Sequence, residues 1–119
     1  MVGARYVPER NDIVWLDFEP TKGKEIGKYR PALVLSGKAY NKATGLLICC
    51  PISTSISGAT TEVQVSNLGK PSVVAANLVM TVVWVQRKVK KEAVAEPGVM
   101  EEVLLRLLPL IGADRLFEG

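Results

Sequence analysis

Residues 12–36 read DIVWLDFEPTKGKEIGKYRPALVLS, and this stretch sets the architecture because two strand patterns flank a polar loop. Residues 12–18 are rich in β-branched and aromatic side chains, which favour strands, and the pattern ends at Glu19 and Pro20. Residues 31–36 give a second, apolar strand pattern. The sequence therefore predicts two β-strands joined by a polar connection.

The connection is basic and holds two glycines. Lys22, Lys24, Lys28 and Arg30 surround a single carboxylate, Glu25. A loop of this kind is suited to phosphate, and Arg30 stands just before the apolar strand, where a rigid scaffold could aim its guanidinium. The alternative is a solvated basic hairpin loop, and the loop's composition alone leaves both readings open.

The rest of the chain predicts a mainly β protein. The expected elements are a short helical turn or loop at 38–45 closed by Gly45, a strand buried on both faces at 46–52, strands at 61–66, 72–76 and 81–89, and an amphipathic helix after Pro97. The apolar positions of that helix, which recur from Met100 to Ile111, are expected to lie on the core. Pro109 is expected to kink or end that helix near Leu108. Five or six short strands without a βαβ rhythm indicate one domain, residues 1–119, built as a strongly bent sheet or small barrel.

Composition suggests partners of two kinds. An apolar fraction of 48% is high for a chain of 119 residues, so we expect some apolar surface to close against a second copy in a homodimer. The net charge is +3, and residues 22–30 and 87–91 hold most of the excess positive charge. Polyanions are natural partners for such patches, although residues 87–91 are equally consistent with a solvated strand end.

Several site classes lack their usual residues. The chain has no histidine and no CxxC spacing, so neither a metal nor another cofactor is expected. Cys49 and Cys50 are adjacent in a predicted strand, so their side chains should point to opposite faces and pack as reduced thiols. The N-terminus has no apolar signal-peptide core, and no apolar run is long enough to span a bilayer. The simplest expectation is a cytoplasmic protein with no membrane partner.

Without histidine, catalysis has to rest on Arg, Lys, Glu, Ser, Thr or Tyr. One reaction suits that inventory, namely cleavage of RNA by attack of its own 2′-hydroxyl on the adjacent phosphate. Arginine can donate two parallel hydrogen bonds to the phosphorane oxygens, and a hydroxyl can supply another. The hydroxyl candidates are Ser53, Thr54 and Ser55, which directly follow the apolar strand. Ser and Thr at a strand end are also common turn formers.

The order of the segments RYVPERNDIVWLDFEPTKGKEIGKYRPALVLS, AYNKATGL and CPIST, with a strand ending at Trp84, strongly resembles the MazF/PemK family of toxin endoribonucleases. The resemblance covers nearly the whole chain. It implies a plug-like barrel related to SH3 barrels, assembled as a homodimer, that cuts single-stranded RNA at short motifs without metal and leaves a 2′,3′-cyclic phosphate. It also implies a cognate MazE-like antitoxin that blocks the groove, with DNA bound only indirectly through the antitoxin.

The resemblance assigns roles residue by residue. The family's essential arginine falls on Arg30, its loop glutamate on Glu25 and its strand-end threonine on Ser53. Arg30 would stabilise the phosphorane, Ser53 would hydrogen-bond the scissile phosphate, and Glu25 would orient Arg30 or act as base. The expected RNA-binding residues are Lys22, Lys24, Lys28, Tyr29, Thr54 and Asn77.

Besides Ser53 in place of the strand-end threonine, the chain departs from the family pattern at three further positions. Tyr29 stands where some relatives place histidine, and Asn77 and Leu78 stand where many carry Asp-Gln. An amide cannot serve as a general base, and leucine cannot read a base edge, so specificity or activity could differ. Tyr29 and Tyr40 are candidates for stacking on a base, whereas Trp15 and Trp84 are expected in the core.

Two alternatives belong to other functional classes. A protein with the same barrel that has lost cleavage would still bind RNA or antitoxin. A gyrase poison of the CcdB type shares the barrel, but that class depends on a C-terminal Trp-Gly-Ile, and this chain ends Leu116-Phe117-Glu118-Gly119.

Overall fold

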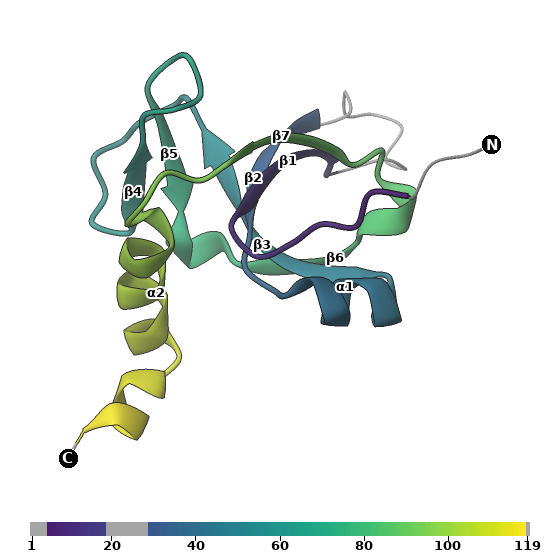
Figure 1. Cartoon of the computed structure of the whole chain (residues 1–119). Helices are drawn as coiled ribbons and strands as arrows, with labels where there is room; N and C mark the ends of the chain where they lie inside the picture. Colours follow the sequence, from purple (N-terminus) through teal and green to yellow (C-terminus); the bar gives the residue numbers. More distant parts are fainter. Residues whose placement is uncertain (1–4, 19–28, 119) are drawn as a thin grey trace, which may run out of the picture.

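The computed structural model describes residues 5–18 and 29–118, which form a curled antiparallel sheet with α1 and α2 at its lower side in Figure 1. In chain order the strands and α-helices are β1 (Asp12–Asp17), β2 (Tyr29–Val34), α1 (Lys38–Thr44), β3 (Leu46–Ser53), β4 (Glu62–Val65), β5 (Ser72–Ala75), β6 (Met80–Val83), β7 (Lys90–Val94) and α2 (Val99–Leu110). Short 3-10 turns are η1 (Ala76–Leu78), η2 (Trp84–Gln86) and η3 (Ala113–Phe117). The predicted mainly β fold with a strongly bent sheet is confirmed.

The sheet is organised around β3. Its order is β4-β5-β3-β2-β1-β7, and β6 also pairs with β3. One edge of β3 faces β2, while the other edge pairs first with β6 and then with β5. Because one strand serves three neighbours, the sheet must bend along it, which produces the half-barrel seen in Figure 1.

The single strand predicted at 81–89 is wrong. The chain forms β6, turns at η2 and Lys88, and only then enters β7, which the sequence did not predict. Trp84 causes the break, because its backbone N–H donates to Gly45 (3.1 Å) and its buried indole N–H donates to the Asn41 carbonyl (2.9 Å). These bonds hold the turn against α1 and direct the chain from the β3 side of the sheet to β1.

The core lies on both faces of the sheet. One cluster contains Ile13, Leu33 and Cys50, and the other contains Val14, Val34 and Cys49 among its members. Adjacent residues therefore fall into different clusters, as the two-residue period of a strand requires. The predicted burial of β3 on both faces is confirmed, and both cysteines are fully buried and unbridged.

Burial should make these two thiols unreactive in the folded protein. Desolvation raises the pKa of Cys49 to about 12, with a smaller contribution from the neighbouring Cys50, and raises the pKa of Cys50 to about 11. Because the thiolate is the nucleophile, we expect no fast labelling by a disulfide reagent at pH 8 and labelling of both thiols in denaturant. Fast labelling of the folded protein would contradict this packing.

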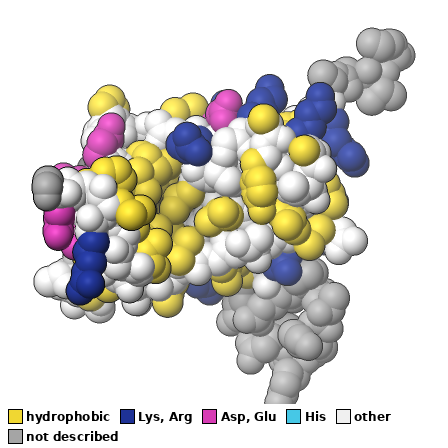
Figure 2. All heavy atoms as spheres, turned by 90° about the horizontal axis from the view of Figure 1, so that it is seen from below, with side chains coloured by type: hydrophobic (Ala, Val, Ile, Leu, Met, Phe, Trp, Pro, Cys, Tyr) yellow, Lys and Arg dark blue, Asp and Glu magenta, His cyan; other side chains and the backbone are white. Residues whose placement is uncertain are grey.

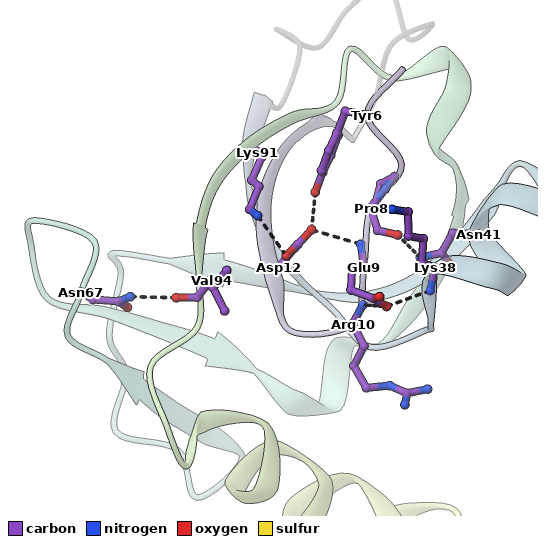
Figure 3. A network of polar contacts seen from close by, with 10 residues as sticks. All are labelled: Tyr6, Pro8, Glu9, Arg10, Asp12, Lys38, Asn41, Asn67, Lys91 and Val94. Carbon is purple, nitrogen blue, oxygen red and sulfur yellow. Dashed lines mark hydrogen bonds and ion pairs between the residues drawn. The ribbon is translucent and has the colours of Figure 1, made fainter. Parts of the chain in front are cut away.

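Buried Asn41 links three segments near α1 (Figure 3). Its side-chain amide donates to the carbonyls of Pro8 (2.8 Å) and Ser36 (3.1 Å). Its side-chain oxygen accepts the Ser36 hydroxyl (2.6 Å), whose oxygen in turn accepts the backbone N–H of Ile48 (2.9 Å). Gly45 ends α1 in the left-handed conformation (φ 73°), which confirms the predicted helical turn closed by glycine.

A second polar network holds the N-terminal segment on the sheet (Figure 3). The buried carboxylate of Asp12 accepts the Tyr6 hydroxyl (2.5 Å) and the Glu9 backbone N–H (3.1 Å), and it lies 3.6 Å from the Lys91 ammonium. Burial raises the pKa of Tyr6, and the hydrogen bond to Asp12 raises it further. Lys91 thus has a structural partner, which lowers the charge that the predicted 87–91 patch offers to a polyanion.

Helix α2 packs one apolar side on the sheet. Val99, Val103 and Leu107 are its buried residues, and the helix contacts β4 and η1. The helix runs to Leu110, two residues beyond the end expected near Leu108, and Pro109 is accommodated inside its last turn, while the kink expected as the alternative stays a prediction. Ile111 is the C-cap of the helix, and Gly112 after it adopts the left-handed conformation (φ 75°).

Exposed apolar side chains gather in a band on the underside of the molecule (Figure 2). The most exposed large apolar residues include Leu105, Ile111, Leu116 and Phe117, all on α2 or the residues after it. Ile111 was predicted to face the core but is 67% exposed. No helix within residues 5–18 and 29–118 is long and apolar enough to cross a membrane.

Candidate functional site

A pocket of about 420 Å³ opens where β2 begins and β3 ends. It is lined by residues from both strands, from β1 and β7, and from the β4–β5 connection. These residues are Trp15, Tyr29, Arg30, Pro31, Ile52, Ser53, Thr54, Leu68, Lys70, Ser72 and Glu92. Four residues predicted for the site, namely Tyr29, Arg30, Ser53 and Thr54, are therefore brought to one pocket although β2 and β3 are separated by α1.

Strand register explains why Arg30 and Ser53 meet. Ala32 pairs with Pro51 across β2 and β3. Continued by two residues, this antiparallel register sets Arg30 opposite Ser53. Arg30 is exposed, and its guanidinium makes no hydrogen bond or ion pair within the part of the chain that the structure describes. The backbone of β2 fixes the position of Arg30, and its guanidinium is available to a ligand.

The Ser53 hydroxyl has a defined orientation. Its oxygen accepts the backbone N–H of Ser55 (2.9 Å), which fixes the side chain at the end of β3. The hydroxyl proton is left free to donate to a group in the pocket. Thr54 follows on the exposed side and lines the same space.

Trp15 and Tyr29 form an aromatic pair in the lining of the pocket. The rings of Trp15 and Tyr29 are stacked, with centroids 5.5 Å apart and planes inclined by 27°. The Tyr29 hydroxyl donates to the Lys88 carbonyl (3.1 Å), and the Trp15 indole N–H donates to Glu92 (3.0 Å). Trp84 is in the core as predicted, whereas the prediction for Trp15 is wrong because its ring lines the pocket.

Arg30 also borders a second, more apolar pocket of about 430 Å³. Asn77 lies there together with Phe18, Leu78 and Met80, and not in the pocket that holds Ser53. The 3-10 turn η1 places Asn77 and Leu78 beside the start of β6. The structure therefore brings Asn77 to Arg30 but not to Ser53.

The remaining predicted site residues are not placed. Glu25, Lys22, Lys24 and Lys28 lie outside the described residues. Within the described ranges, no group of three or more Cys, Asp or Glu side chains could hold a metal ion, and the expectation of metal-free chemistry stays a prediction.

The pocket residues that sequence reasoning missed include Trp15, Lys70 and Glu92. Lys70 and Glu92 come from segments far from residues 29–54 in sequence, and only the sheet order brings them together. The charged composition of β7 gave no strand signal from which its position could have been found.

Arg87, which was expected to contribute to the basic patch at residues 87–91, has a structural role. The Arg87 guanidinium donates to the carbonyls of Asp17 (3.2 Å) and Phe18 (2.9 Å), at the end of β1. Together with the Lys91–Asp12 contact, this makes part of the 87–91 patch structural. Lys88 and Lys90 are exposed.

Known proteins share both the sequence and the fold. Residues 9–111 match the family of PemK-like, MazF-like toxins of type II toxin–antitoxin systems. The endoribonuclease toxin MazF of Escherichia coli K12 is 37% identical over 109 residues, covering 92% of this chain and 98% of that protein. The crystal structure of MazF from Deinococcus radiodurans is 40% identical and superposes with a TM-score of 0.82, covering 91% of this chain and 99% of that one. A MazE–MazF complex from the same organism gives 40% identity and a TM-score of 0.84 over 91% of this chain and 98% of that one.

The curled sheet and its pocket define a class of small, mainly β proteins with an exposed arginine at an open strand junction. Within that class, the chain belongs to the PemK-like, MazF-like toxin family of type II toxin–antitoxin systems.

Proposed function

We propose that this protein is a toxin that cleaves single-stranded RNA at short sequence motifs without a metal ion. The observation that carries the proposal is that Arg30 and Ser53 line one pocket, where the Arg30 guanidinium has no hydrogen bond or ion pair to the described residues and the Ser53 hydroxyl is positioned by the Ser55 N–H. Relatives over nearly the full length of the chain are named as endoribonucleases. Single-stranded RNA as substrate is consistent with action in the cytoplasm.

The proposed reaction is an internal transesterification. The 2′-hydroxyl oxygen of one nucleotide attacks the adjacent phosphorus, the bond from phosphorus to the 5′-oxygen of the next nucleotide breaks, and a 2′,3′-cyclic phosphate forms. The 2′-hydroxyl proton passes to a base, and the leaving 5′-oxygen receives a proton. Arg30 would donate to the phosphorane oxygens, where charge accumulates, and Ser53 would donate one further hydrogen bond. Glu25 is proposed to orient Arg30 or to act as the base.

The departures at residues 77 and 78 suggest a second candidate, a homologue that binds RNA or antitoxin without cutting. Asn77 lines the apolar pocket and not the pocket of Ser53, so an amide at this position does not remove a group from the proposed cleavage site. This placement favours the nuclease.

A long single-stranded RNA separates the two candidates. The purified protein in EDTA is expected to cut it at recurring motifs and to leave termini that carry a 2′,3′-cyclic phosphate and a 5′-hydroxyl. Intact RNA that migrates as a complex would instead identify the non-cleaving binder. RNA that is neither cut nor bound would refute both.

Ser53→Ala is expected to slow cleavage about a hundredfold, because one donor to the phosphorane is removed. Ser53→Thr keeps the hydroxyl and should stay near the wild-type rate. Ser66→Ala, at an exposed serine outside the pocket, is the matched control. Initial rates on one end-labelled RNA measure all four proteins, and equal rates for the wild type and Ser53→Ala would remove Ser53 from the mechanism.

The partners proposed are a second copy of the chain and a MazE-like antitoxin. Exposed apolar side chains such as Leu105 and Phe117 provide surface for a homodimer. Arg30 lies between a polar pocket and an apolar one, which suits an antitoxin segment carrying both carboxylates and apolar side chains. Contact with DNA is proposed only through the antitoxin.

Sedimentation velocity tests the homodimer directly. At micromolar concentration we expect a single species with twice the mass of the chain, because apolar side chains exposed this extensively usually mark an interface. A species of monomer mass throughout that concentration range would contradict the proposal.

A further inference from the structure

Glu92 is the unexpected residue of the pocket. Its carboxylate belongs to the same pocket lining as two cationic residues, Arg30 and Lys70, and this pocket is proposed to bind a polyanion. Within the described residues Glu92 forms no ion pair, and its hydrogen-bond partner is the Trp15 indole N–H, which donates to Oε1 at 3.0 Å. The carboxylate is therefore held in place by a neutral donor and is not neutralised by a neighbouring cation.

A carboxylate in this position repels phosphate, so its chemistry points to a different part of a nucleotide. An ionised carboxylate only accepts hydrogen bonds. On single-stranded RNA, the donors to meet it are the exocyclic amino groups of adenine, cytosine and guanine, which are free when the bases are unpaired. Uracil lacks an amino group and presents two carbonyl oxygens on either side of its N–H, so at least one of them would face the carboxylate.

A surface for the base lies beside this carboxylate. Tyr29 is 45% exposed, its ring is stacked on Trp15, and its hydroxyl is fixed on the Lys88 carbonyl. Trp15 contacts both partners, since it stacks on Tyr29 and donates to Glu92. One side chain thus sets the distance between an aromatic platform and a hydrogen-bond acceptor, which is the pair of features that reads an unpaired base.

We propose that Trp15, Tyr29 and Glu92 form a nucleobase subsite in which Glu92 accepts a hydrogen bond from an exocyclic amino group and thereby discriminates against uracil. This assignment rests on the proposed function only in taking single-stranded RNA as the ligand. The base occupies the aromatic end of the pocket, and the scissile phosphate occupies the end formed by Arg30 and Ser53.

Glu92→Gln is the sharpest variant. The amide keeps an oxygen that can accept the Trp15 indole N–H, so the anchor is retained, and it gains an N–H₂ group that can donate to a uracil carbonyl. Glu92 is exposed, so the substitution leaves the core untouched. Glu101→Gln, at an exposed carboxylate on α2 outside this pocket, changes the net charge equally and is the matched control.

Cleavage of an RNA pool with randomised positions gives the first readout. Sequencing of the products from the wild type and from Glu101→Gln is expected to show one position near the cut where uracil is disfavoured about tenfold, the size of discrimination that one specific base contact gives. Glu92→Gln should accept uracil there within about twofold of the other bases. The proposal is overturned if no position disfavours uracil, or if Glu92→Gln keeps the wild-type preference.

Binding of uncleavable 2′-O-methyl RNA gives a readout that does not need catalysis. Fluorescence anisotropy should show an oligouridine binding about tenfold more weakly than an oligocytidine to the wild type, and nearly equal binding of the two to Glu92→Gln. Equal binding of both oligomers by the wild type, or unchanged discrimination in the variant, overturns the subsite. If the wild type discriminates in binding but cuts no RNA, the nuclease proposal fails while the subsite is upheld.

Discussion

Arg30→Ala is expected to slow RNA cleavage about a thousandfold or more while leaving the fold intact. The guanidinium is exposed and makes no hydrogen bond within the described residues, so its loss costs the folded state little. In the proposed reaction it is the principal donor to the phosphorane. Loss of a single neutral donor already costs about 10²- to 10³-fold, and a charged, bidentate donor contributes more.

Two variants sharpen this expectation. Arg30→Lys keeps the charge but not the planar pair of donors, so it should recover only part of the lost rate. Arg115→Ala removes an equal charge from the exposed C-terminal turn η3 and should cut RNA like the wild type. Single-turnover cleavage rates on one RNA test these expectations, and circular dichroism verifies that each variant is folded. Undiminished cleavage by Arg30→Ala would refute the proposed mechanism.

Asn41→Ala is expected to be the most damaging polar substitution for stability, at about 3 to 5 kcal/mol. The side chain is fully buried and supplies both donors and an acceptor, so alanine leaves the Pro8 carbonyl and the Ser36 hydroxyl without their partners. The bond from Trp84 survives, because it goes to the backbone carbonyl of residue 41. A loss of this size lowers the melting temperature by about 10 to 20 °C in a chain of this length.

Asn67→Ala provides the matched control. The Asn67 amide also donates to a backbone carbonyl, that of Val94 at 3.0 Å (Figure 3), but this hydrogen bond is exposed at the surface. Water can replace this bond, so the cost should stay at or below about 1 kcal/mol. Thermal or urea unfolding of both variants gives the comparison, and similar losses for Asn41→Ala and Asn67→Ala would contradict the account of the buried network.

The sequence predicted those elements whose signal is local. Residues 12–18 and 46–52 carry apolar and β-branched runs, and both are strands in the structure. The secondary-structure prediction was wrong where tertiary contacts override the local preference of the residues for helix or strand. The strand expected at 81–89 breaks because buried Trp84 is bonded to α1, and β7 forms from charged residues because β1 offers it an edge. Pro109 is tolerated because it falls in the last turn of α2.

The residues of the candidate site also fall into two groups, those with a local sequence signal and those brought to the site only by the tertiary structure. Arg30 and Ser53 were predictable because each stands next to a strong apolar strand and matches a family pattern. Trp15 was assigned to the core because tryptophan usually packs there, yet its position on β1 turns the ring toward the pocket. Lys70 and Glu92 could not be predicted, since their proximity to Arg30 depends on how β5 and β7 pair with β3 and β1.

The neighbouring cysteines show that β3 belongs to both apolar clusters at once. A slip of this strand by one residue would exchange its inward and outward side chains, and both clusters would be disrupted together. Neither cluster can then unfold while the other stays folded. The protein should therefore unfold in a single cooperative step, because β3 contributes side chains to both apolar clusters.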